Sequence, residues 1–391
     1  MKTADAVIVG GGVTGASIAF HLAGLGMRRI LVLERKFVGA GGTGRSVGII
    51  RQLYPTAETT QMVRASLAVF RSFADAVGGV SGYVGCGALI GVSPGMRAGL
   101  QARVDQQRAL GVKAEMLEPS ELHRVEPRID PSGLGAVLYE PESGYGDPSA
   151  VTAGYADAAR RRGVSIEQGA EVVEVLKEGD RVSGVATSTE RVAAPIVVNA
   201  AGLWSPRVAR MADLTLPIVI GRHPVFIVER PSTFGSAHMV YMDLAGGSYV
   251  RPETGGLTLT GSLTDDEAQH PMDPELLGSE AGFEEASVVL ARTAQALPGL
   301  ADARLSRSYA GAFDITPDWM PILDESSLGG FFIAAGMSGH GFKLAPMVGA
   351  MVAARITGTA SPISLVPFRL DRFRDAANPG TFVSSYLGVT G

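Results

Sequence analysis

Residues 6–34 read AVIVGGGVTGASIAFHLAGLGMRRILVLE, and they contain a complete nucleotide-binding pattern. The run opens with short apolar residues typical of a buried parallel strand. Gly10, Gly12 and Gly15 follow in the spacing G-x-G-x-x-G, and apolar residues then recur at helical spacing. A second apolar strand ends in Glu34. This order of strand, turn, helix, strand and acidic residue predicts a Rossmann-type dinucleotide-binding fold.

Each residue of the motif has a physical role in that fold. Gly10 permits the tight turn, Gly12 lets the backbone approach a pyrophosphate, and Gly15 lets the helix pack closely on the strand. The partial positive charge at the helix N-terminus then faces the phosphates. Glu34 can accept hydrogen bonds from ribose hydroxyls, and its charge disfavours NADP. The motif alone leaves NAD and FAD open.

Length and composition exclude several classes of protein. The 391 residues predict two or three domains at roughly 100–200 residues per domain. The formal net charge of -5 gives no basic footprint for nucleic acid, so we expect no nucleic-acid partner. Glycine, at 51 residues, is nearly twice its usual share of about 7%. The glycines fall in clusters, which indicates backbone lying close to a large ligand.

The single cysteine, Cys86, excludes an internal disulfide and any thiolate metal site. The six histidines show no metal-binding spacing, so we expect no metal and a reducing, cytoplasmic setting. The first residues run directly into the apolar strand, so we expect no export signal. The longest uncharged apolar stretches, such as residues 192–204 and 344–354, are shorter than the ~20 residues that span a bilayer. We therefore expect no membrane span.

The rest of the chain predicts two kinds of sheet. We expect a helix over residues 151–162 and strands over 172–175 and 195–202 that return to the nucleotide sheet. Residues 215–265 alternate apolar and polar side chains between turn signals, which predicts an antiparallel sheet. A last strand, glycine loop and helix occupy residues 331–356.

The predicted fold class is α/β plus an antiparallel sheet, with a discontinuous Rossmann-type domain and a mixed α+β substrate-binding domain. The Rossmann-type domain is assigned to residues 1–79, 145–214 and 311–391, and the substrate-binding domain to residues 80–144 and 215–310.

Five motifs, in order along nearly the whole chain, resemble one family. They are GGGVTG with Glu34-Arg35, GGTGRS leading into IIR (41–51), NAAGLW (199–204), TPD (316–318) and SGHGFK (338–343). The chain thus resembles the FAD-dependent amino-acid oxidases and dehydrogenases that include D-amino-acid oxidase, glycine oxidase and sarcosine oxidase. The IIR and GHGFK signatures are most similar to those of sarcosine oxidases and the β subunits of heteromeric amine oxidases and dehydrogenases.

The resemblance implies FAD as the cofactor, with its pyrophosphate on the first helix and its ribose on Glu34. The implied FAD-binding residues are Gly10, Gly12, Val13, Thr14, Gly15, Glu34, Arg35, Gly42, Thr43, Arg45, Ser46, Val172, Ala201, Gly202, Trp204, Gly336, Gly339, His340, Gly341, Phe342 and Lys343. Sarcosine oxidases attach their flavin through a cysteine, whereas this chain has Gly311 at the matching position. We therefore expect FAD to be bound non-covalently.

The resemblance also implies substrate-binding residues. Arg51 and Lys343 match the cations that hold a carboxylate above the flavin, and Tyr249 matches a tyrosine of the active site. Arg251 lies on the same strand face as Tyr249, where it could bind a second carboxylate, form an ion pair or sit at a solvated edge. His223 could be an ordinary sheet histidine, and we assign no general base.

Two departures from the family concern the electron acceptor and the fine mechanism. The lysine that activates oxygen in sarcosine oxidases is matched by Thr258, so oxygen or another acceptor could reoxidise the flavin. The basic residue expected three positions before Arg51 is Gly48. Both differences limit how much of the family's mechanism carries over.

By resemblance, the expected reaction is hydride transfer from the α-carbon of a small amino acid to the flavin, which gives an imine that water hydrolyses. Sarcosine, glycine and N-substituted amino acids are the expected substrate type. The alternatives are a partner-dependent FAD subunit and a nicotinamide-dependent dehydrogenase. The protein could form a homo-oligomer or a heteromeric complex.

Overall fold

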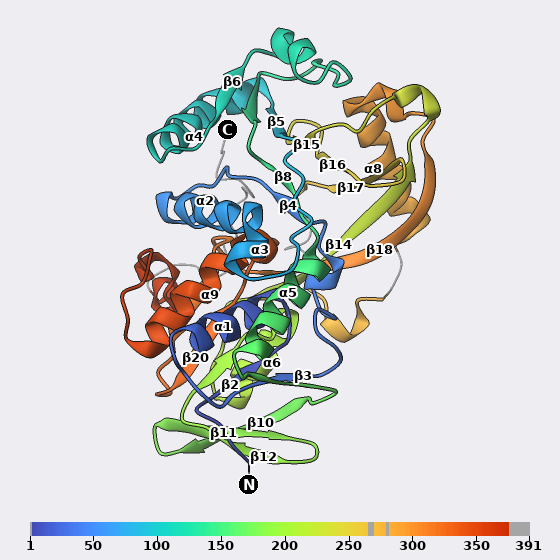
Figure 1. The fold of residues 1–391 in the computed structure, drawn as a ribbon. Helices are drawn as coiled ribbons and strands as arrows, with labels where there is room; N and C mark the ends of the chain where they lie inside the picture. Colours follow the sequence, from blue (N-terminus) through green and yellow to red (C-terminus); the bar gives the residue numbers. More distant parts are fainter. Residues whose placement is uncertain (1, 265–269, 279–280, 375–391) are drawn as a thin grey trace.

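The computed structural model describes residues 2–264, 270–278 and 281–374, and a six-stranded sheet in it carries the nucleotide motif (Figure 1). Its strands in spatial order are β19 (Ile322–Glu325), β20 (Phe331–Ala335), β13 (Val197–Asn199), β2 (Ala6–Val9), β3 (Ile30–Glu34) and β9 (Ser165–Gln168). Neighbouring strands are parallel except that β19 runs antiparallel to β20. The Rossmann-type fold predicted from the glycine motif is confirmed.

Both faces of this sheet are buried, as its apolar strands require. Ile8 and Val32 point to one core, and Val7 and Leu33 point to the other. The first face is covered by α1 (Val13–Gly24), α5 (Pro148–Arg161) and α9 (Gly341–Thr357), with α2 (Ala57–Arg71) against α9 and α3 (Phe73–Ala76) following α2. The second is covered by α6 (Ser205–Met211) and a four-stranded sheet of β1 (Lys2–Thr3), β12 (Arg191–Ala193), β11 (Arg181–Thr187) and β10 (Val172–Glu178).

Three predicted elements differ from the structure in their bounds or their place. The helix expected over 151–162 is α5, which begins at Pro148 because the Asp147 side chain accepts hydrogen bonds from two backbone N–H groups of its first turn. The strand expected over 172–175 belongs to the four-stranded sheet and does not return to the nucleotide sheet. The strand expected over 195–202 is limited to β13, since the chain turns into the 3-10 helix η4 (Gly202–Trp204).

An eight-stranded sheet forms the other half of the molecule, and the antiparallel arrangement predicted for residues 215–265 is confirmed. Its strands in order are β18 (Arg304–Ile315), β14 (Val219–Glu229), β17 (Leu257–Ser262), β16 (Ser248–Pro252), β15 (Val240–Asp243), β5 (Ala88–Val92), β7 (Ala136–Glu140) and β6 (Glu115–Leu117). Only β15 and β5 pair in parallel within it. The helices α4 (Arg97–Ala109) and α8 (Phe283–Ala296) lie against this sheet.

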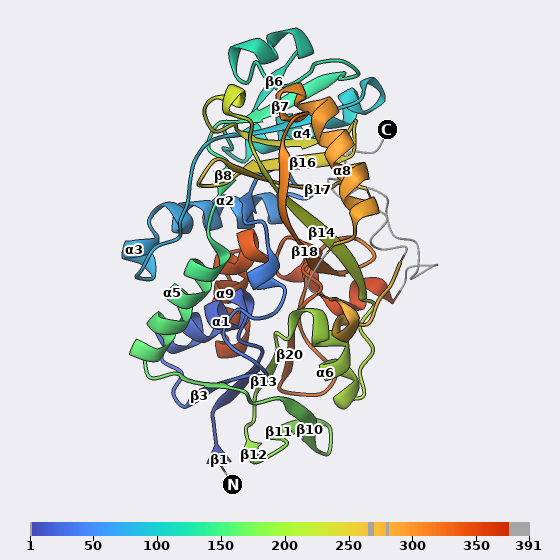
Figure 2. The same cartoon turned by 90° about the vertical axis from the view of Figure 1, so that its right-hand side faces the viewer.

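The long strands β14 and β18 run from the nucleotide-binding half into the upper half (Figure 2). The small β4 (Ile49–Ile50) and β8 (Gly144–Tyr145) pair between the halves. Strand β18 continues past residue 311, and the domain boundaries remain a prediction. The described short 3-10 helices are η1 (Thr43–Arg45), η2 (Pro94–Met96), η3 (Pro119–Arg124), η4, η5 (Ser232–Phe234), η6 (Pro274–Leu276), η7 (Pro298–Leu300), η8 (Val366–Phe368) and η9 (Leu370–Phe373).

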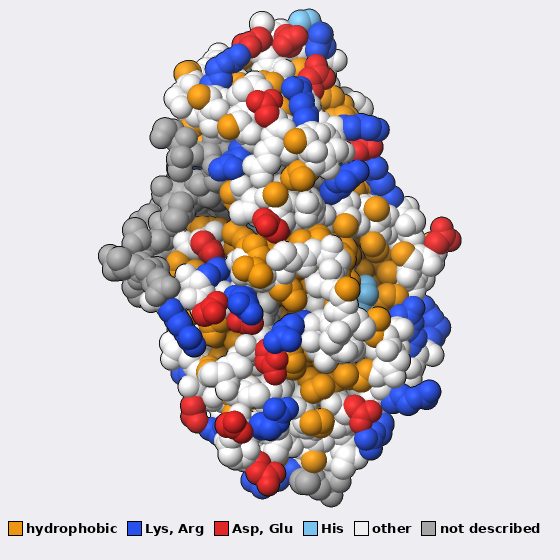
Figure 3. Space-filling view, turned by 90° about the vertical axis from the view of Figure 1, so that its left-hand side faces the viewer, with side chains coloured by type: hydrophobic (Ala, Val, Ile, Leu, Met, Phe, Trp, Pro, Cys, Tyr) orange, Lys and Arg blue, Asp and Glu red, His pale blue; other side chains and the backbone are white. Residues whose placement is uncertain are grey.

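On the face that carries α2, α4 and α9, hydrophobic side chains gather across the middle of the molecule, and charged side chains of both signs are interspersed around them (Figure 3). Among the described residues, none of the helices is long and apolar enough to cross a membrane.

Candidate functional site

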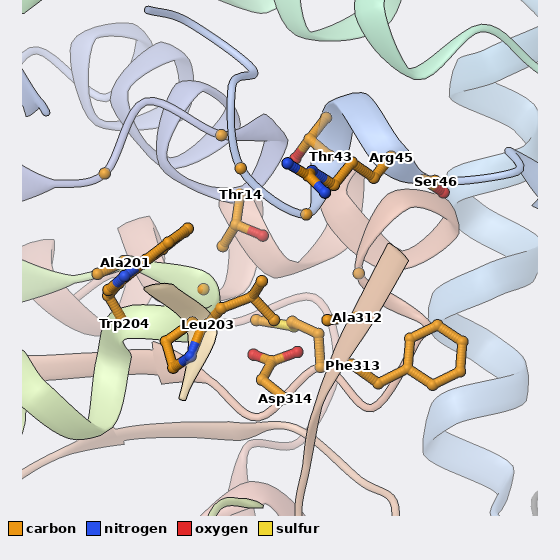
Figure 4. Close-up of a pocket in the computed structure, with 18 of the residues that line it drawn as sticks. Thr14, Thr43, Arg45, Ser46, Ala201, Leu203, Trp204, Ala312, Phe313 and Asp314 are labelled. Atoms are coloured by element: carbon orange, nitrogen blue, oxygen red, sulfur yellow. The ribbon is translucent and has the colours of Figure 1, made fainter. Parts of the chain in front are cut away.

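A cavity of about 460 Å³ lies where the carboxyl ends of β2, β3 and β13 meet the inner face of the eight-stranded sheet. This is the edge at which open parallel sheets bind nucleotides, and the volume is in the usual range of roughly 300–1,000 Å³ for ligand sites. Figure 4 shows Trp204 toward one end of the cavity and the ring of Phe313 toward the other, with Thr14, Thr43 and Asp314 between them. We call these the nucleotide end and the reaction end.

The glycine turn leaves no room for side chains at two of its positions. Gly10 has φ of +112°, and a Cβ atom there would lie 2.4 Å from the carbonyl oxygen of Ala200. A Cβ atom on Gly15 would lie 2.0 Å from the carbonyl oxygen of Gly10. Gly15 lies outside the cavity lining, and its role is the close packing of helix on strand that the sequence predicts.

Helix α1 begins at the cavity. Its N-cap, Gly12, provides no side chain to cap the helix, and the N–H of Val13 donates to Thr43 Oγ1 at 3.1 Å. The side chain of Thr14 also lines the cavity (Figure 4). A helix N-terminus that opens into a cavity attracts negative charge, so this end fits a pyrophosphate.

Glu34 ends β3 in a buried position at the cavity wall. Its Oε2 accepts a hydrogen bond from the N–H of Gly11 at 2.8 Å, and its Oε1 accepts one from the N–H of Lys36 at 2.8 Å. These bonds fix the carboxylate, which keeps lone pairs available for ribose hydroxyls. The residues therefore fit the adenosine part of a dinucleotide.

Segment 274–278 closes the nucleotide end through one carboxylate. Both Glu275 oxygens accept from Arg35, at 2.5 and 3.0 Å, and Oε1 also accepts from Trp204 Nε1 at 2.8 Å. The Arg35 guanidinium lies 4.2 Å from the centre of the Trp204 ring. These hydrogen bonds, above all the two from Arg35, lower the pKa of Glu275 to about 2. No sequence motif pointed to Glu275, because its partners are distant in the chain.

Most of the other predicted FAD-binding residues also line this cavity: Gly42, Thr43, Arg45, Ser46, Val172, Ala201, Gly202 and Trp204. In the C-terminal loop, Gly339, Gly341, Phe342 and Lys343 line it. Gly336 and His340 lie behind it: the N–H of Gly336 donates to Asp314 Oδ2 at 2.9 Å, and the His340 ring packs edge-on against Tyr54. Asp314 also lines the cavity, and burial raises its pKa to about 6.

Two buried cations mark the reaction end. Arg51 is 1% exposed, donates to the carbonyl oxygen of Leu53 and lies 4.6 Å from the centre of the Tyr54 ring. Lys343, in the first turn of α9, is 5% exposed with its Nζ 3.4 Å from the carbonyl oxygen of Gly339. Burial and, after it, the charge of Arg51 hold the pKa of Lys343 well below its usual range. Such a pair favours an anionic ligand.

His223 was not predicted as a site residue, yet the structure places it in the cavity wall beside Tyr249. Its Nε2 lies 3.0 Å from the Tyr249 hydroxyl, and its ring stacks on Phe313 with ring centres 4.4 Å apart. The signal in the sequence was the alternation along β14, which points His223 to the same face as Val225.

The register of β17 corrects the expectation for Thr258. Tyr249 pairs with Gly261 and therefore shares its face, so the cavity side of β17 carries Leu259 and Gly261. Thr258 points to the opposite face, where its Oγ1 lies 2.8 Å from His238 Nε2. The match of Thr258 to the oxygen-activating lysine is therefore wrong by strand parity. Within the described strand β17, no cation faces the cavity.

Arg251 shares the strand face of Tyr249 but lies outside the cavity lining. It donates to Glu253 Oε2 at 2.8 Å and to the carbonyl oxygen of Pro252 at 2.9 Å, and its guanidinium lies 4.3 Å from the centre of the Tyr145 ring. This position corresponds to the ion-pair alternative and does not support a second carboxylate site.

Comparison with known proteins decides between the two dinucleotides. The family model described as DAO, FAD dependent oxidoreductase, matches residues 5–355. The chain belongs to this FAD-dependent family. The resemblance is thereby confirmed, FAD is the cofactor, and the nicotinamide alternative is wrong. Groups of three or more histidine, cysteine or acidic residues that could hold a metal are absent from the part of the chain that the structure describes.

Relatives share the fold along nearly the whole chain. The chain is 30% identical over 352 residues to 4-methylaminobutanoate oxidase (formaldehyde-forming) of Paenarthrobacter nicotinovorans. The matched stretch covers 88% of this chain but only 42% of that relative. The chain is 29% identical to sarcosine oxidase subunit beta of Rhizobium meliloti (strain 1021), over 94% of this chain and 88% of the relative. The structure of L-proline dehydrogenase from P. horikoshii aligns over 95% of this chain and 98% of its own, with a TM-score of 0.87 and 26% identity.

Proposed function

We propose that this protein oxidises the carbon–nitrogen bond of a small amino acid that it holds through one carboxylate. The observation that carries the proposal is the pair of buried cations, Arg51 and Lys343, at the reaction end of an FAD-family cavity. Two buried cationic side chains at one end of a cavity favour an anionic ligand, and a substrate carboxylate supplies that charge. The planar guanidinium of Arg51 can bind it with two parallel hydrogen bonds.

The chain's residues at the other end would hold the cofactor. The N-terminus of α1 would bind the pyrophosphate and Glu34 the ribose, while the turn from Gly339 to Lys343 would face the flavin. When bound, FAD supplies the acceptor for two electrons from the substrate. We propose non-covalent binding, because the described residues that line the cavity include Gly311 but no cysteine.

The main contribution of the protein to the reaction is positioning. Arg51 and Lys343 fix the carboxylate, and His223 with Tyr249 offers polar atoms to the amine. A buried site beside two cations favours the neutral form of that amine, which is the form that can be oxidised. No residue has to act as a general base in this scheme.

The cavity favours one carboxylate and an aliphatic remainder. Besides the polar residues, the reaction end is lined by Ile49, Met242 and Leu263, which can contact methyl or methylene groups. Arg251 is already paired with Glu253. Sarcosine, proline and similar N-alkyl amino acids therefore fit better than iminodiacetate, whose second carboxylate would have to meet this apolar wall. The names of the relatives, a methylaminobutanoate oxidase and a proline dehydrogenase, agree with this substrate type.

A second candidate function is that of a dehydrogenase that passes electrons to an acceptor other than oxygen. The supporting observation is the cavity side of β17, where Leu259 and Gly261 stand and the described strand contributes no cation. Similarity to a sarcosine oxidase subunit beta also makes a partner chain a candidate for receiving those electrons.

The test is the visible spectrum of the purified protein before and after acid precipitation, followed by anaerobic addition of sarcosine, proline, glycine, D-alanine and iminodiacetate. We expect yellow FAD in the acid supernatant and bleaching by sarcosine or proline but not by iminodiacetate. Bleaching by iminodiacetate alone would overturn the single-carboxylate substrate. Admission of air and, separately, of a reducible dye to the bleached protein distinguishes oxidase from dehydrogenase.

A further inference from the structure

We propose that Glu140 is the positioning residue that holds Arg51 in its carboxylate-binding geometry. Glu140 lies in β7 and is 0% exposed, and it stands outside the cavity lining. The inference rests on the proposed role of Arg51 and extends it to the network behind that residue.

The carboxylate of Glu140 collects three hydrogen bonds from three parts of the chain. Its Oε2 accepts from the backbone N–H of Gln52 at 2.8 Å and from the Ser143 hydroxyl at 2.6 Å. Its Oε1 accepts from Gln107 Nε2 in α4 at 2.7 Å. These bonds offset the cost of burying the charge.

The network acts on the segment that carries the cation. Gln52 follows Arg51 directly, so the bond from its N–H to Glu140 fixes the peptide that links the two residues. The neighbouring residues are held as well, since Ile50 pairs with Gly144 and the Arg51 side chain donates to the carbonyl oxygen of Leu53. The buried Glu140 carboxylate thus holds the residue next to the proposed ligand-binding arginine. This arrangement is expected of a residue that preorganises a site.

The Glu140→Gln variant tests this directly, because one amide oxygen must replace two carboxylate oxygens facing the N–H donors of Gln52 and Gln107. We expect the FAD content to stay unchanged and the Kd of acetate, followed through the absorption spectrum of the bound flavin, to rise about tenfold. The KM for the substrate should rise by a similar factor while kcat changes less. An unchanged acetate Kd would overturn the proposal.

The matched control is Glu126→Gln, which also neutralises a buried glutamate of the same half of the molecule. Glu126 is 2% exposed and accepts hydrogen bonds from Arg128 and from the N–H of Met239, which lie outside the cavity lining. This variant should lower the stability of the fold without raising the Kd of acetate. If Glu126→Gln raises the Kd of acetate as much as Glu140→Gln does, the effect comes from a general loss of rigidity in this half of the molecule, and the proposal fails.

A double-mutant cycle with Arg51→Ala separates this inference from the proposed function. Because Glu140 acts through Arg51, adding Glu140→Gln to Arg51→Ala should raise the acetate Kd no further. If Arg51→Ala itself leaves acetate binding unchanged, the carboxylate role of Arg51 is wrong. If Arg51→Ala raises the Kd of acetate and Glu140→Gln does not, only the positioning role of Glu140 is wrong. Ser143→Ala, which removes one of the three bonds, should give a smaller rise and serves if Glu140→Gln does not fold.

Discussion

The two ends of the cavity bind charge in different ways. At the nucleotide end, one short glycine turn lines the cavity, and the Glu275 side chain that closes this end is 44% exposed. At the reaction end, Arg51 and Lys343 are 1% and 5% exposed and come from opposite ends of the sequence. The turn that would hold the cofactor is a local property of the chain, whereas the proposed substrate site is assembled by the tertiary fold. Mutations at one end should therefore impair FAD binding, and mutations at the other end should impair reaction with the substrate, each without the other.

The largest effect is expected for Arg51→Ala. Removing one partner of a buried charge pair costs about 2–5 kcal/mol, so anaerobic flavin reduction at a low substrate concentration should slow about 100-fold or more. FAD should stay bound, because Arg51 belongs to the reaction end. Stopped-flow absorbance gives the rate and the visible spectrum gives the FAD content.

Arg103→Ala is a suitable control, since Arg103 donates to the carbonyl oxygen of Pro55 just beyond the same segment but lies outside the cavity lining. Flavin reduction at the normal rate in Arg51→Ala would show that Arg51 does not bind the substrate carboxylate. Loss of FAD in that variant would show that the two ends are not separable.

The next largest effect is expected for Gly15→Ala, which changes the nucleotide end and not the reaction end. The added Cβ atom would lie 2.0 Å from the carbonyl oxygen of Gly10, so helix α1 or the turn must shift. We expect FAD affinity, measured by titrating the apoprotein and following flavin fluorescence, to fall about 100-fold, as a shift of about 1 Å in a preorganised site can cost. Gly95→Ala is the control, because nothing lies within 4 Å of its Cβ position. Unchanged affinity in Gly15→Ala would contradict the packing role.

The same contrast explains what the sequence could predict. The nucleotide end was predictable because strand, turn, helix and Glu34 lie within residues 6–34, where spacing alone fixes their geometry. The segment 274–278 that closes this end is the exception, because it arrives from a distant part of the chain. Glu275 had no local pattern to identify it.

At the reaction end the sequence supplied residues through resemblance but not their register. Thr258 was matched to the wrong face because a strand shifted by one residue turns every side chain over. His223 was set aside, although its position in β14 turns it toward Tyr249. Arg251 was placed on the correct face, but the sequence could not show its pairing with Glu253. These errors are all errors of tertiary pairing, which local propensity does not encode.

A smaller effect distinguishes the two ends by pH. The pKa of Lys343 is lowered in its buried position, so the amine is neutral above that pKa. A bound carboxylate stabilises the charged form, so binding takes up a proton and the acetate Kd should rise with pH, by at most about tenfold per pH unit. Titration of the flavin spectrum with acetate at several pH values measures this slope. Lys343→Met should abolish it, and a slope that persists in the variant would assign the proton to another group.

The smallest effect is expected at Glu275, because its ion pair with Arg35 is partly exposed and therefore screened. Glu275→Gln should speed FAD release about threefold, the range of an exposed pair worth about 0.2–1 kcal/mol. Added salt should speed release in the original protein but less in the variant. Since the pKa of Glu275 is about 2, its charge is constant above pH 4, and release should not change between pH 5 and 8 through this group. Glu118→Gln, which breaks an exposed pair with Arg97 outside the cavity lining, should leave the rate unchanged. Equal release from both variants and the original protein would mean that the backbone turn alone retains the cofactor.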